Sequence, residues 1–352
     1  MVRIGVIGYG YWGPNLVRNF AETEDAEVVA VADYSPERLA LARKRHPAIT
    51  VATDPEELIN SPLVDAIAIA TPVSTHFNLA MRALRAGKHV MVEKPITTTP
   101  EEAARLVEEA ARRKLTLMVD HTFLYTPAVR KIRDIYDRGD LGDIYYYDSV
   151  RVNLGLFQSD VNVIWDLAVH DLSIMDYLLP ESPCAVSATG VSHVAGRGEN
   201  IAYLTLFFPS KLIAHIHVNW LAPVKVRQTL IGASNKMVVY DDLEVSEKVK
   251  VYDKGITLQG DPADEYQMRI GYRSGDVWTP HLGTREALAV EAAEFVNCVM
   301  TGARPTSDGE TGLRIVSMLD AAERSMKDHG RPVDITAFIP KQEQPEWSHS
   351  LI

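Results

Sequence analysis

Five short apolar runs alternate with amphipathic segments over the first third of the chain, and this alternation constrains the fold most. The runs are VRIGVIG, AEVVAVAD, VDAIAIAT, KHVMVEK and LTLMVDH, at residues 2–8, 26–33, 64–71, 88–94 and 115–121. Continuous apolar runs of this length are typical of strands that are buried on both faces. The segments between several of them have helical periodicity, so the pattern predicts a parallel sheet with helical crossovers.

From about residue 144 the pattern changes to segments in which apolar and polar residues alternate. They lie at 143–153, 184–195, 200–208, 212–222, 224–234 and 236–242. Alternation of this kind with tight polar connections predicts an antiparallel meander that has one more polar face. Two helical segments follow, at 286–302 and 309–327, and we expect them near the domain junction.

These patterns predict a doubly wound α/β domain followed by an α+β domain with a large, open-faced, mostly antiparallel sheet. The predicted ranges are 1–122 for the first domain, 123–334 for the second and 335–352 for a C-terminal tail without clear periodicity. With 352 residues, 46% of them hydrophobic, the chain is long enough to bury two such cores.

The composition excludes several classes of partner. A formal charge of −11 repels nucleic-acid phosphates. Because no apolar run approaches the roughly 20 residues of a membrane span, and the start of the chain does not resemble a signal peptide, we expect a cytoplasmic protein. Cys184 and Cys298 have no His or Cys neighbours at ligand spacing, so no metal site is predicted.

The first apolar run ends in a G-x-G-x-x-G pattern, Gly8, Gly10 and Gly13, which stands between the first predicted strand and helix. In a Rossmann fold the first glycine permits a tight turn, the second lets the backbone approach a pyrophosphate, and the third lets the helix pack closely on the strand. The helix N-terminus then adds a partial positive charge. We expect Tyr11 and Trp12 to line the same cofactor site.

The second run ends in Asp33, 20 positions after Gly13. A carboxylate there accepts hydrogen bonds from the adenosine ribose hydroxyls and repels a 2′-phosphate, so it favours NAD over NADP. The alternative is that Asp33 only caps the next helix.

Two further motifs follow predicted strands, where ligands of parallel sheets bind. Glu93 and Lys94 close the fourth run, and Lys94 is expected beside the nicotinamide half of the cofactor. Thr71 and Pro72 close the third run, with His76 on the first turn of the next helix. We predict cofactor contacts for all of them, although Lys94 could be a surface lysine and His76 a packing or capping residue.

The segment WDLAVHDLSIMDYLL places polar side chains on one stripe of a helix. Asp166, His170, Ser173 and Tyr177 share this stripe, and apolar residues occupy the opposite face. The alternative is a solvated polar face. Asp171 lies at the edge of the apolar face, and we assign it no chemistry.

Together these motifs resemble the Gfo/Idh/MocA family of glucose-fructose oxidoreductase and inositol dehydrogenase relatives, and the likeness extends over nearly the whole chain. AGKHVMVEKP is the most specific of them. The resemblance implies an NAD-binding domain, a sheet domain that often makes the oligomer contact, and oxidation or reduction of a sugar or cyclitol hydroxyl. It also implies that Lys94, Asp166 and His170 line the active site.

Hydride transfer from a secondary alcohol requires removal of the hydroxyl proton. His170 is our predicted general base, because an imidazole has an ordinary pKa of about 6.5. We expect Asp166 to orient the substrate or the imidazole, and Lys94 to stabilise charge on the reacting oxygen. A lysine desolvated beside the cofactor could instead be the base, and the sequence leaves this choice open.

The leading functional hypothesis is an NAD-dependent dehydrogenase of a sugar, with amino sugars and nucleotide-linked sugars as candidate substrates. The alternatives are an inositol or cyclitol dehydrogenase, an NAD-dependent glycosidase and a non-catalytic NAD-binding sugar sensor. Five polar side chains are candidates for substrate contacts: Tyr125, Arg151, Asn153, Asn162 and His281. Because a large apolar sheet face is rarely left exposed on a monomer, we expect a homodimer or homotetramer through the second sheet.

Overall fold

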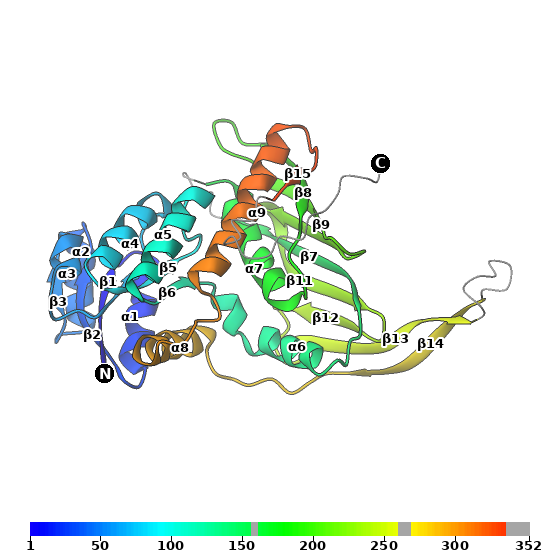
Figure 1. Cartoon of the computed structure of the whole chain (residues 1–352), viewed down its shortest axis with the longest axis horizontal. Helices are drawn as coiled ribbons and strands as arrows, with labels where there is room; N and C mark the ends of the chain where they lie inside the picture. Colours follow the sequence, from blue (N-terminus) through cyan, green and yellow to red (C-terminus); the bar gives the residue numbers. More distant parts are fainter. Residues whose placement is uncertain (156–160, 260–268, 336–352) are drawn as a thin grey trace.

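The computed structural model describes residues 1–155, 161–259 and 269–335 (Figure 1). Its N-terminal part is a six-stranded parallel sheet with the order β3-β2-β1-β4-β5-β6. The strands are β1 (Val2–Ile7), β2 (Ala26–Ala32), β3 (Thr50–Ala52), β4 (Ala66–Ile69), β5 (His89–Glu93) and β6 (Leu117–Asp120). The doubly wound α/β prediction is confirmed, and the five apolar runs form five of the strands. The sequence analysis missed β3, which is only three residues long.

Five helices pack against this sheet: α1 (Gly13–Glu22), α2 (Pro36–Arg45), α3 (Pro55–Ile59), α4 (His76–Arg85) and α5 (Pro100–Arg113). Local sequence explains where several of them begin. The side chains of Ser35, Asp54 and Thr99 each accept a hydrogen bond from a backbone N–H of the first turn, and a proline follows each cap. These signals fix the loops that surround the carboxyl edge of the sheet.

The C-terminal part contains a nine-stranded sheet with the order β14-β13-β12-β11-β7-β10-β9-β8-β15. Its strands are β7 (Ile144–Leu154), β8 (Ala185–Val191), β9 (Ile201–Phe207), β10 (Ile213–Asn219), β11 (Leu221–Ala233), β12 (Met237–Asp241), β13 (Val249–Gln259), β14 (Arg269–Trp278) and β15 (Val333–Asp334). The sheet is mostly antiparallel, as predicted, but it is not a simple meander. β7 lies between β11 and β10 and runs parallel to β10. The hairpin of β13 and β14, which was not predicted, extends away from the body (Figure 1).

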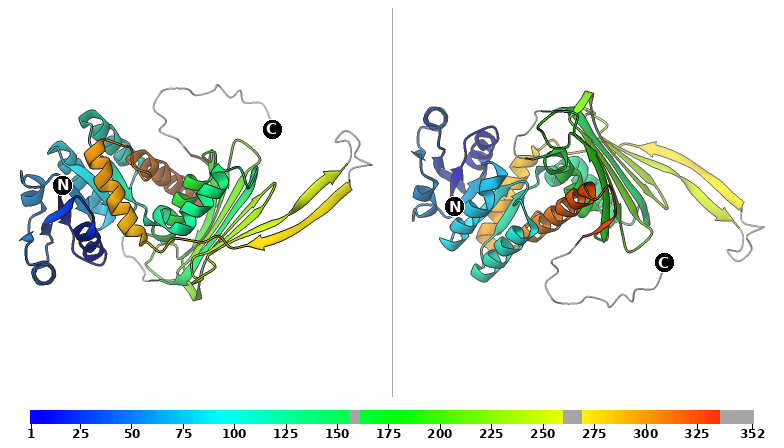
Figure 2. Two further views of the ribbon diagram at one scale, coloured as in Figure 1. Left: turned by 90° about the horizontal axis from the view of Figure 1, so that it is seen from below. Right: turned by 90° about the horizontal axis from the view of Figure 1, so that it is seen from above.

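Helices cover only one face of this sheet (Figure 2). They are α6 (Pro127–Asp137), α7 (Val169–Leu178) and α9 (Gly309–Lys327). The alternation along β9 shows the difference between the faces, because Ala202, Leu204 and Leu206 are buried whereas Tyr203 and Phe207 are exposed. The second sheet is therefore open on one side.

The last helices return to the first sheet and join the two halves. α8 (Ala287–Thr301) packs on α1, where the rings of Phe20 and Phe295 lie 5.9 Å apart. The backbone N–H of Val119 on β6 donates to the carbonyl of Ser307, 2.8 Å away. Among the described residues, no helix has the length and apolar character needed to cross a membrane.

Candidate active site

The glycine loop after β1 has the geometry that a pyrophosphate site requires. Gly8 has a φ of +97°, and a Cβ at this position would overlap the carbonyl oxygen of Ala70. A Cβ at Gly13 would overlap the carbonyl oxygen of Gly8, so the helix and the strand approach too closely for a side chain. At Gly10, by contrast, a Cβ would meet only the Arg38 side chain, at 3.5 Å. The backbone at Gly10 is therefore open to a ligand.

A cleft of about 1220 Å³ runs along the carboxyl edge of the parallel sheet in front of this loop. The predicted cofactor residues that line it are Gly8, Gly10, Tyr11, Trp12, Asp33, Thr71, Pro72, Glu93 and Lys94. His76 does not line the cleft. It is buried, and its ring nitrogens lie 2.9 Å from the carbonyl oxygen of Pro95 and 2.8 Å from that of Thr71. His76 thus ties together the two loops that carry Thr71 and Lys94.

Asp33 stands at the end of β2 and faces the glycine loop. Its Oδ2 accepts a hydrogen bond from the backbone N–H of Tyr9 at 2.7 Å, and its Oδ1 accepts one from the N–H of Ser35. The cap of α2 is Ser35 rather than Asp33. Arg38, which the sequence analysis missed, also lines the cleft, 3.6 Å from Oδ2 of Asp33.

The different surroundings of the three glycines lead to a prediction. Gly10→Ala is expected to lower NAD⁺ affinity by about tenfold, or about 1.4 kcal/mol, because a methyl group enters the space in front of the loop. Its free energy of unfolding should stay within about 0.5 kcal/mol of that of the unchanged protein. Gly13→Ala is expected to lose about 2 kcal/mol or more of stability because of its overlap with Gly8. Calorimetric titration with NAD⁺ and thermal unfolding separate the two effects. Equal destabilisation by both substitutions would contradict this explanation.

A second cavity, of about 490 Å³, opens between the two sheets. It shares Tyr11, Trp12, Glu93 and Lys94 with the dinucleotide cleft, so the two spaces meet at these residues. Its other lining residues are Asp120, Thr122, Phe123, Thr126, Asp166, His170 and Arg227. The cavity therefore brings together the three predicted catalytic residues, Lys94 directly after β5 and Asp166 and His170 from the helical segment that follows β7.

Lys94 and Asp166 form an ion pair at the wall of this cavity. The Lys94 Nζ donates to the backbone oxygen of Asp166 at 3.0 Å and to its Oδ1 at 3.3 Å. The indole Nε1 of Trp220 donates to Oδ2 of Asp166 at 3.1 Å. Asp166 lies in a π-helical turn, η3 (Ile164–Ala168), that precedes α7. Its carboxylate is thus held between Lys94 and Trp220, with both partners fixing its orientation.

His170 lies four residues further on and faces the same cavity. Its ring packs edge-on against Phe123, with centroids 4.9 Å apart, and its Nδ1 is buried without a hydrogen-bond partner among the described residues. Burial lowers the pKa of His170 well below its usual value, and the nearby positive charges of Lys94 and Arg151 lower it further. At neutral pH the imidazole is uncharged and can accept a proton.

The structure places Asp171 and Arg151 behind the site. Their side chains are 2% and 4% exposed and form a buried ion pair, with Nε of Arg151 2.6 Å from Oδ2 of Asp171. Ser149 also donates to Asp171. Because Asp171 already engages its guanidinium, Arg151 does not line the cavity as a substrate group would. Arg227, the register neighbour of Arg151 on β11, does line it and pairs with Asp242 at 2.6 Å.

The other substrate candidates lie outside this cavity. Tyr125 is buried, and its hydroxyl is hydrogen-bonded to Glu294 and Ser307. Asn153 is partly exposed near the end of β7. His281 is exposed beside a different cavity of about 590 Å³.

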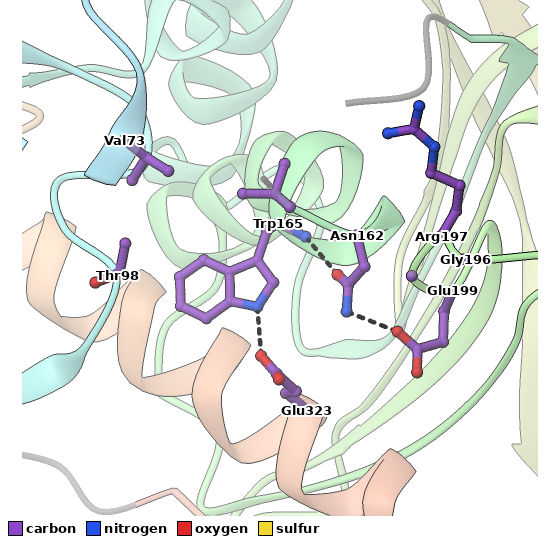
Figure 3. A pocket seen from close by; sticks show the side chains of 10 residues that line it. Val73, Thr98, Asn162, Trp165, Gly196, Arg197, Glu199 and Glu323 are labelled. Atoms are coloured by element: carbon purple, nitrogen blue, oxygen red, sulfur yellow. Dashed lines mark hydrogen bonds between the residues drawn. The ribbon is translucent and has the colours of Figure 1, made fainter. Parts of the chain in front are cut away.

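Asn162 borders another cavity, of about 380 Å³, shown in Figure 3. Its amide donates to Glu199 at 2.9 Å, and its Oδ1 accepts from the backbone N–H of Trp165, whose indole is bonded to Glu323. Asn162 therefore anchors the turn that carries Asp166.

Comparison with known families agrees with this geometry. Residues 2–121 match the model described as an oxidoreductase family with an NAD-binding Rossmann fold. Residues 129–238 match the GFO/IDH/MocA C-terminal domain. The chain belongs to the GFO/IDH/MocA family. Its cofactor is therefore NAD, and the open loop at Gly10 and the helix α1 behind it fit the pyrophosphate of such a dinucleotide.

The family relatives include sugar and polyol dehydrogenases. UDP-N-acetylglucosamine 3-dehydrogenase from Acidithiobacillus ferrooxidans is 29% identical over 324 residues, which cover 90% of this chain and 94% of that protein. Its solved structure has a TM-score of 0.77 at 26% identity and covers 92% of this chain and 98% of that one. Myo-inositol 2-dehydrogenase from Thermotoga maritima is 25% identical over 344 residues, or 93% of this chain and 97% of that protein.

The active-site region of this GFO/IDH/MocA chain also contains residues that the sequence analysis missed. Asp120 is the last residue of β6, at the carboxyl edge of the sheet, so its position at a strand end could have identified it. Phe123 and Arg227 had no local signal. Within residues 1–155, 161–259 and 269–335, no group of three or more His, Cys, Asp or Glu side chains is arranged to hold a metal ion.

Proposed function

We propose that this NAD-dependent oxidoreductase oxidises a secondary hydroxyl of a sugar, with an amino sugar or a nucleotide-linked sugar as the favoured substrate. The observation that carries the proposal is the convergence of Lys94, Asp166 and His170 on one cavity that meets the dinucleotide cleft at Glu93 and Lys94. The relative that acts on UDP-N-acetylglucosamine supports the substrate class. We also propose that residues 1–122 hold the cofactor and that residues 123–334 supply His170 and Asp166.

His170, Lys94 and Asp166 have different proposed roles in the oxidation of the hydroxyl. NAD⁺, when bound, accepts the hydride. His170 is the proposed general base, because its uncharged imidazole can take the hydroxyl proton. The ion pair with Asp166 holds Nζ of Lys94 at the wall of the cavity, where it is proposed to stabilise negative charge on the substrate oxygen. Asp166 is proposed to position Lys94, since Trp220 holds the other carboxylate oxygen.

A panel of substrates with NAD⁺ tests the proposal through NADH absorbance. The panel contains UDP-N-acetylglucosamine, its free sugar, other aldoses and the inositols. Turnover of an inositol but of no sugar would favour the cyclitol dehydrogenase instead, for which the likeness to myo-inositol 2-dehydrogenase is the supporting observation. Tight NAD⁺ binding with no turnover of any compound would refute the proposed reaction and favour a sensor.

The lowered pKa of His170 predicts an unusual pH dependence. If His170 is the base, activity is lost only when the imidazole becomes protonated, and its pKa lies below the usual value of about 6.5. We therefore expect kcat/KM to remain high below pH 6.5 and to fall only in more acidic solution. A pH profile of kcat/KM, with Lys44→Met as a surface control, measures this. An acidic limb centred at or above pH 6.5 would contradict the assignment.

We further propose that a second copy of the chain covers the open face of the nine-stranded sheet, giving a homodimer or homotetramer. The exposed aromatic and aliphatic side chains of Tyr203, Phe207 and Ile213 support this, because they lie on neighbouring strands of that face. Phe207→Glu is expected to shift the molecular mass measured by light scattering toward the monomer. Leu63→Glu, at an apolar position of the first domain that is even more exposed, is the control. An unchanged mass for Phe207→Glu would count against this interface.

A further inference from the structure

A buried group of three carboxyls lies beside the junction of the two cavities. Glu93 ends β5 and Asp120 ends β6, and the two residues are directly opposite in the register of these strands. Glu291 approaches from α8. Asp120 is 2% exposed and Glu291 is 0% exposed, while Oε1 of Glu93 is shielded from solvent. Glu93 as a whole is partly buried, whereas Asp120 and Glu291 are fully buried. Acidic groups in such surroundings need an explanation, because a buried carboxylate requires compensation.

Asp120 has that compensation. Its Oδ2 accepts a hydrogen bond from the indole Nε1 of Trp12 at 2.7 Å, and its Oδ1 accepts one from the hydroxyl of Thr122. The carboxyls of Glu93 and Glu291 both approach Asp120, because Glu93 is its register partner and α8 packs on the turn after β6. Of the three carboxyls, Asp120 therefore has the hydrogen-bond donors that stabilise a negative charge.

Glu93 accepts one hydrogen bond, at Oε2 from the backbone N–H of Lys94 at 3.2 Å, whereas Glu291 accepts none from the described residues. In the described part of the chain, no N–H or O–H group donates to either oxygen of Glu291 or to Oε1 of Glu93. The hydroxyl of Thr122 lies close to Glu291 but gives its single proton to Asp120. Two carboxylates cannot hydrogen-bond to each other unless one carries a proton. The contacts with Asp120 are satisfied if Glu93 and Glu291 are neutral acids that donate to it.

The electrostatic surroundings agree with this protonation. Burial raises the pKa of Glu93 and of Glu291 well above the usual value, and the charge of Asp120 raises both further. Lys94 acts on Glu93 in the opposite direction. Burial also lowers the pKa of the neighbouring His121 to about 4, so this side chain adds no positive charge at neutral pH.

The remaining groups packed around Glu291 supply no positive charge that would stabilise its ionised form. Tyr125 lies on the turn after β6 that α8 packs against, and burial raises the pKa of its phenol, which stays neutral. Glu294, one turn further along α8, pairs with Arg130 at 3.1 Å. The three carboxyls therefore lack a strong positive partner other than Lys94 among the described residues.

We propose that Glu93, Asp120 and Glu291 share protons as one unit, and that this unit releases a proton when NAD⁺ occupies the cleft and retains it when NADH is bound. Glu93 lines both the cavity and the cleft, and Asp120 lines the cavity. The nicotinamide ring is positively charged in NAD⁺ but neutral in NADH. A nearby positive charge favours the ionised form of a carboxyl. The inference rests on the proposed placement of NAD and is independent of the substrate.

The proposal also assigns a destination to the substrate proton. Oxidation of the alcohol breaks one C–H and one O–H bond, the hydride goes to the nicotinamide, and the proton goes first to His170. Because the positive charge of the ring disappears in the same step, the three-carboxyl unit regains affinity for one proton. That proton replaces the one released to solvent when NAD⁺ bound, so each turnover releases one proton in total.

Calorimetric titration without any substrate tests the proposal. NAD⁺ and NADH are titrated separately into the cofactor-free enzyme at pH 7, in two buffers of different ionisation enthalpy, and the difference in heat counts the protons released. We expect up to about one proton released per NAD⁺ and close to none per NADH. Glu291→Gln, whose amide can still donate to Asp120, is expected to reduce the release with NAD⁺ at least twofold. Glu294→Gln on the same helix is the matched control and should release as much as the unchanged protein.

Infrared spectroscopy of the cofactor-free protein gives a second readout. The carbonyl band of a protonated carboxylic acid is expected at pH 7 and should weaken in Glu291→Gln but not in Glu294→Gln. The proposal is overturned if NAD⁺ and NADH release equal numbers of protons, or if Glu291→Gln keeps both the release and the band. If neither cofactor produced binding heat, the proposed cleft itself would be refuted, a result distinct from failure of the substrate panel.

Discussion

Lys94→Met is expected to lower kcat/KM by about 10³-fold on whichever alcohol the enzyme oxidises, with NAD⁺ affinity changed no more than about threefold. Lys94 Nζ is held at the meeting point of the two cavities by the backbone oxygen and the carboxylate of Asp166. Methionine preserves the length and apolar stem of the side chain but removes the charge that stabilises the reacting oxygen. The loss should therefore fall on the chemical step, and kcat should fall with little change in KM.

Two comparisons make this result specific. Lys44→Met removes an exposed lysine of α2 and is expected to leave kcat/KM unchanged within twofold. Asp166→Asn keeps the shape of the carboxyl but weakens the ion pair with Lys94, so an intermediate loss is expected. If Lys94→Met lost less than tenfold while His170→Ala lost far more, Lys94 would not stabilise the reacting oxygen and its ion pair would be structural.

The parts of the site that the sequence predicted share one property, which is that they sit at ends of elements. Gly10, Asp33 and Lys94 each follow a strand of the parallel sheet, and such ends meet along one edge by the geometry of the fold. The sequence pattern is sufficient to place these residues, because residues at the carboxyl ends of neighbouring parallel strands lie close together in space. The cofactor cleft could therefore be predicted without knowledge of any side-chain contact.

The substrate side was harder to predict because its residues come from elements whose relative positions depend on the second sheet. The sequence does not distinguish Arg151 from Arg227 as a substrate contact, since both are arginines in strands with an alternating pattern, and they are register partners. Only the packing of α7 determines which of the two arginines lines the cavity. Asp171 on α7 forms an ion pair with Arg151, and both side chains are buried. The side chain of Arg227, by contrast, lines the cavity. The predicted polar stripe from Asp166 to Tyr177 is also not uniform, because Ser173 on it is fully buried and its hydroxyl donates to the backbone oxygen of His170.

Asp171→Leu is expected to destabilise the protein by about 3–5 kcal/mol, the largest stability effect that we predict. Removal of the carboxylate leaves the guanidinium of Arg151 buried at 4% exposure beside the ring of Phe123, without its charged partner. Among the described residues, no other carboxylate forms an ion pair with that guanidinium to replace Asp171. The loss should appear as a lower midpoint of urea unfolding at pH 7.

Asp176→Leu is the matched control, because Asp176 lies on the same helix and pairs with Arg314 at 2.7 Å. Arg314 is 38% exposed, so water can hydrate its guanidinium once the aspartate is gone, and the expected loss is only about 1 kcal/mol. The double variant Arg151→Met with Asp171→Leu should recover much of the stability, since it leaves no unpaired buried charge. Equal losses for Asp171→Leu and Asp176→Leu would show that burial of the arginine does not determine the cost, and the explanation given for Arg151 would then be wrong.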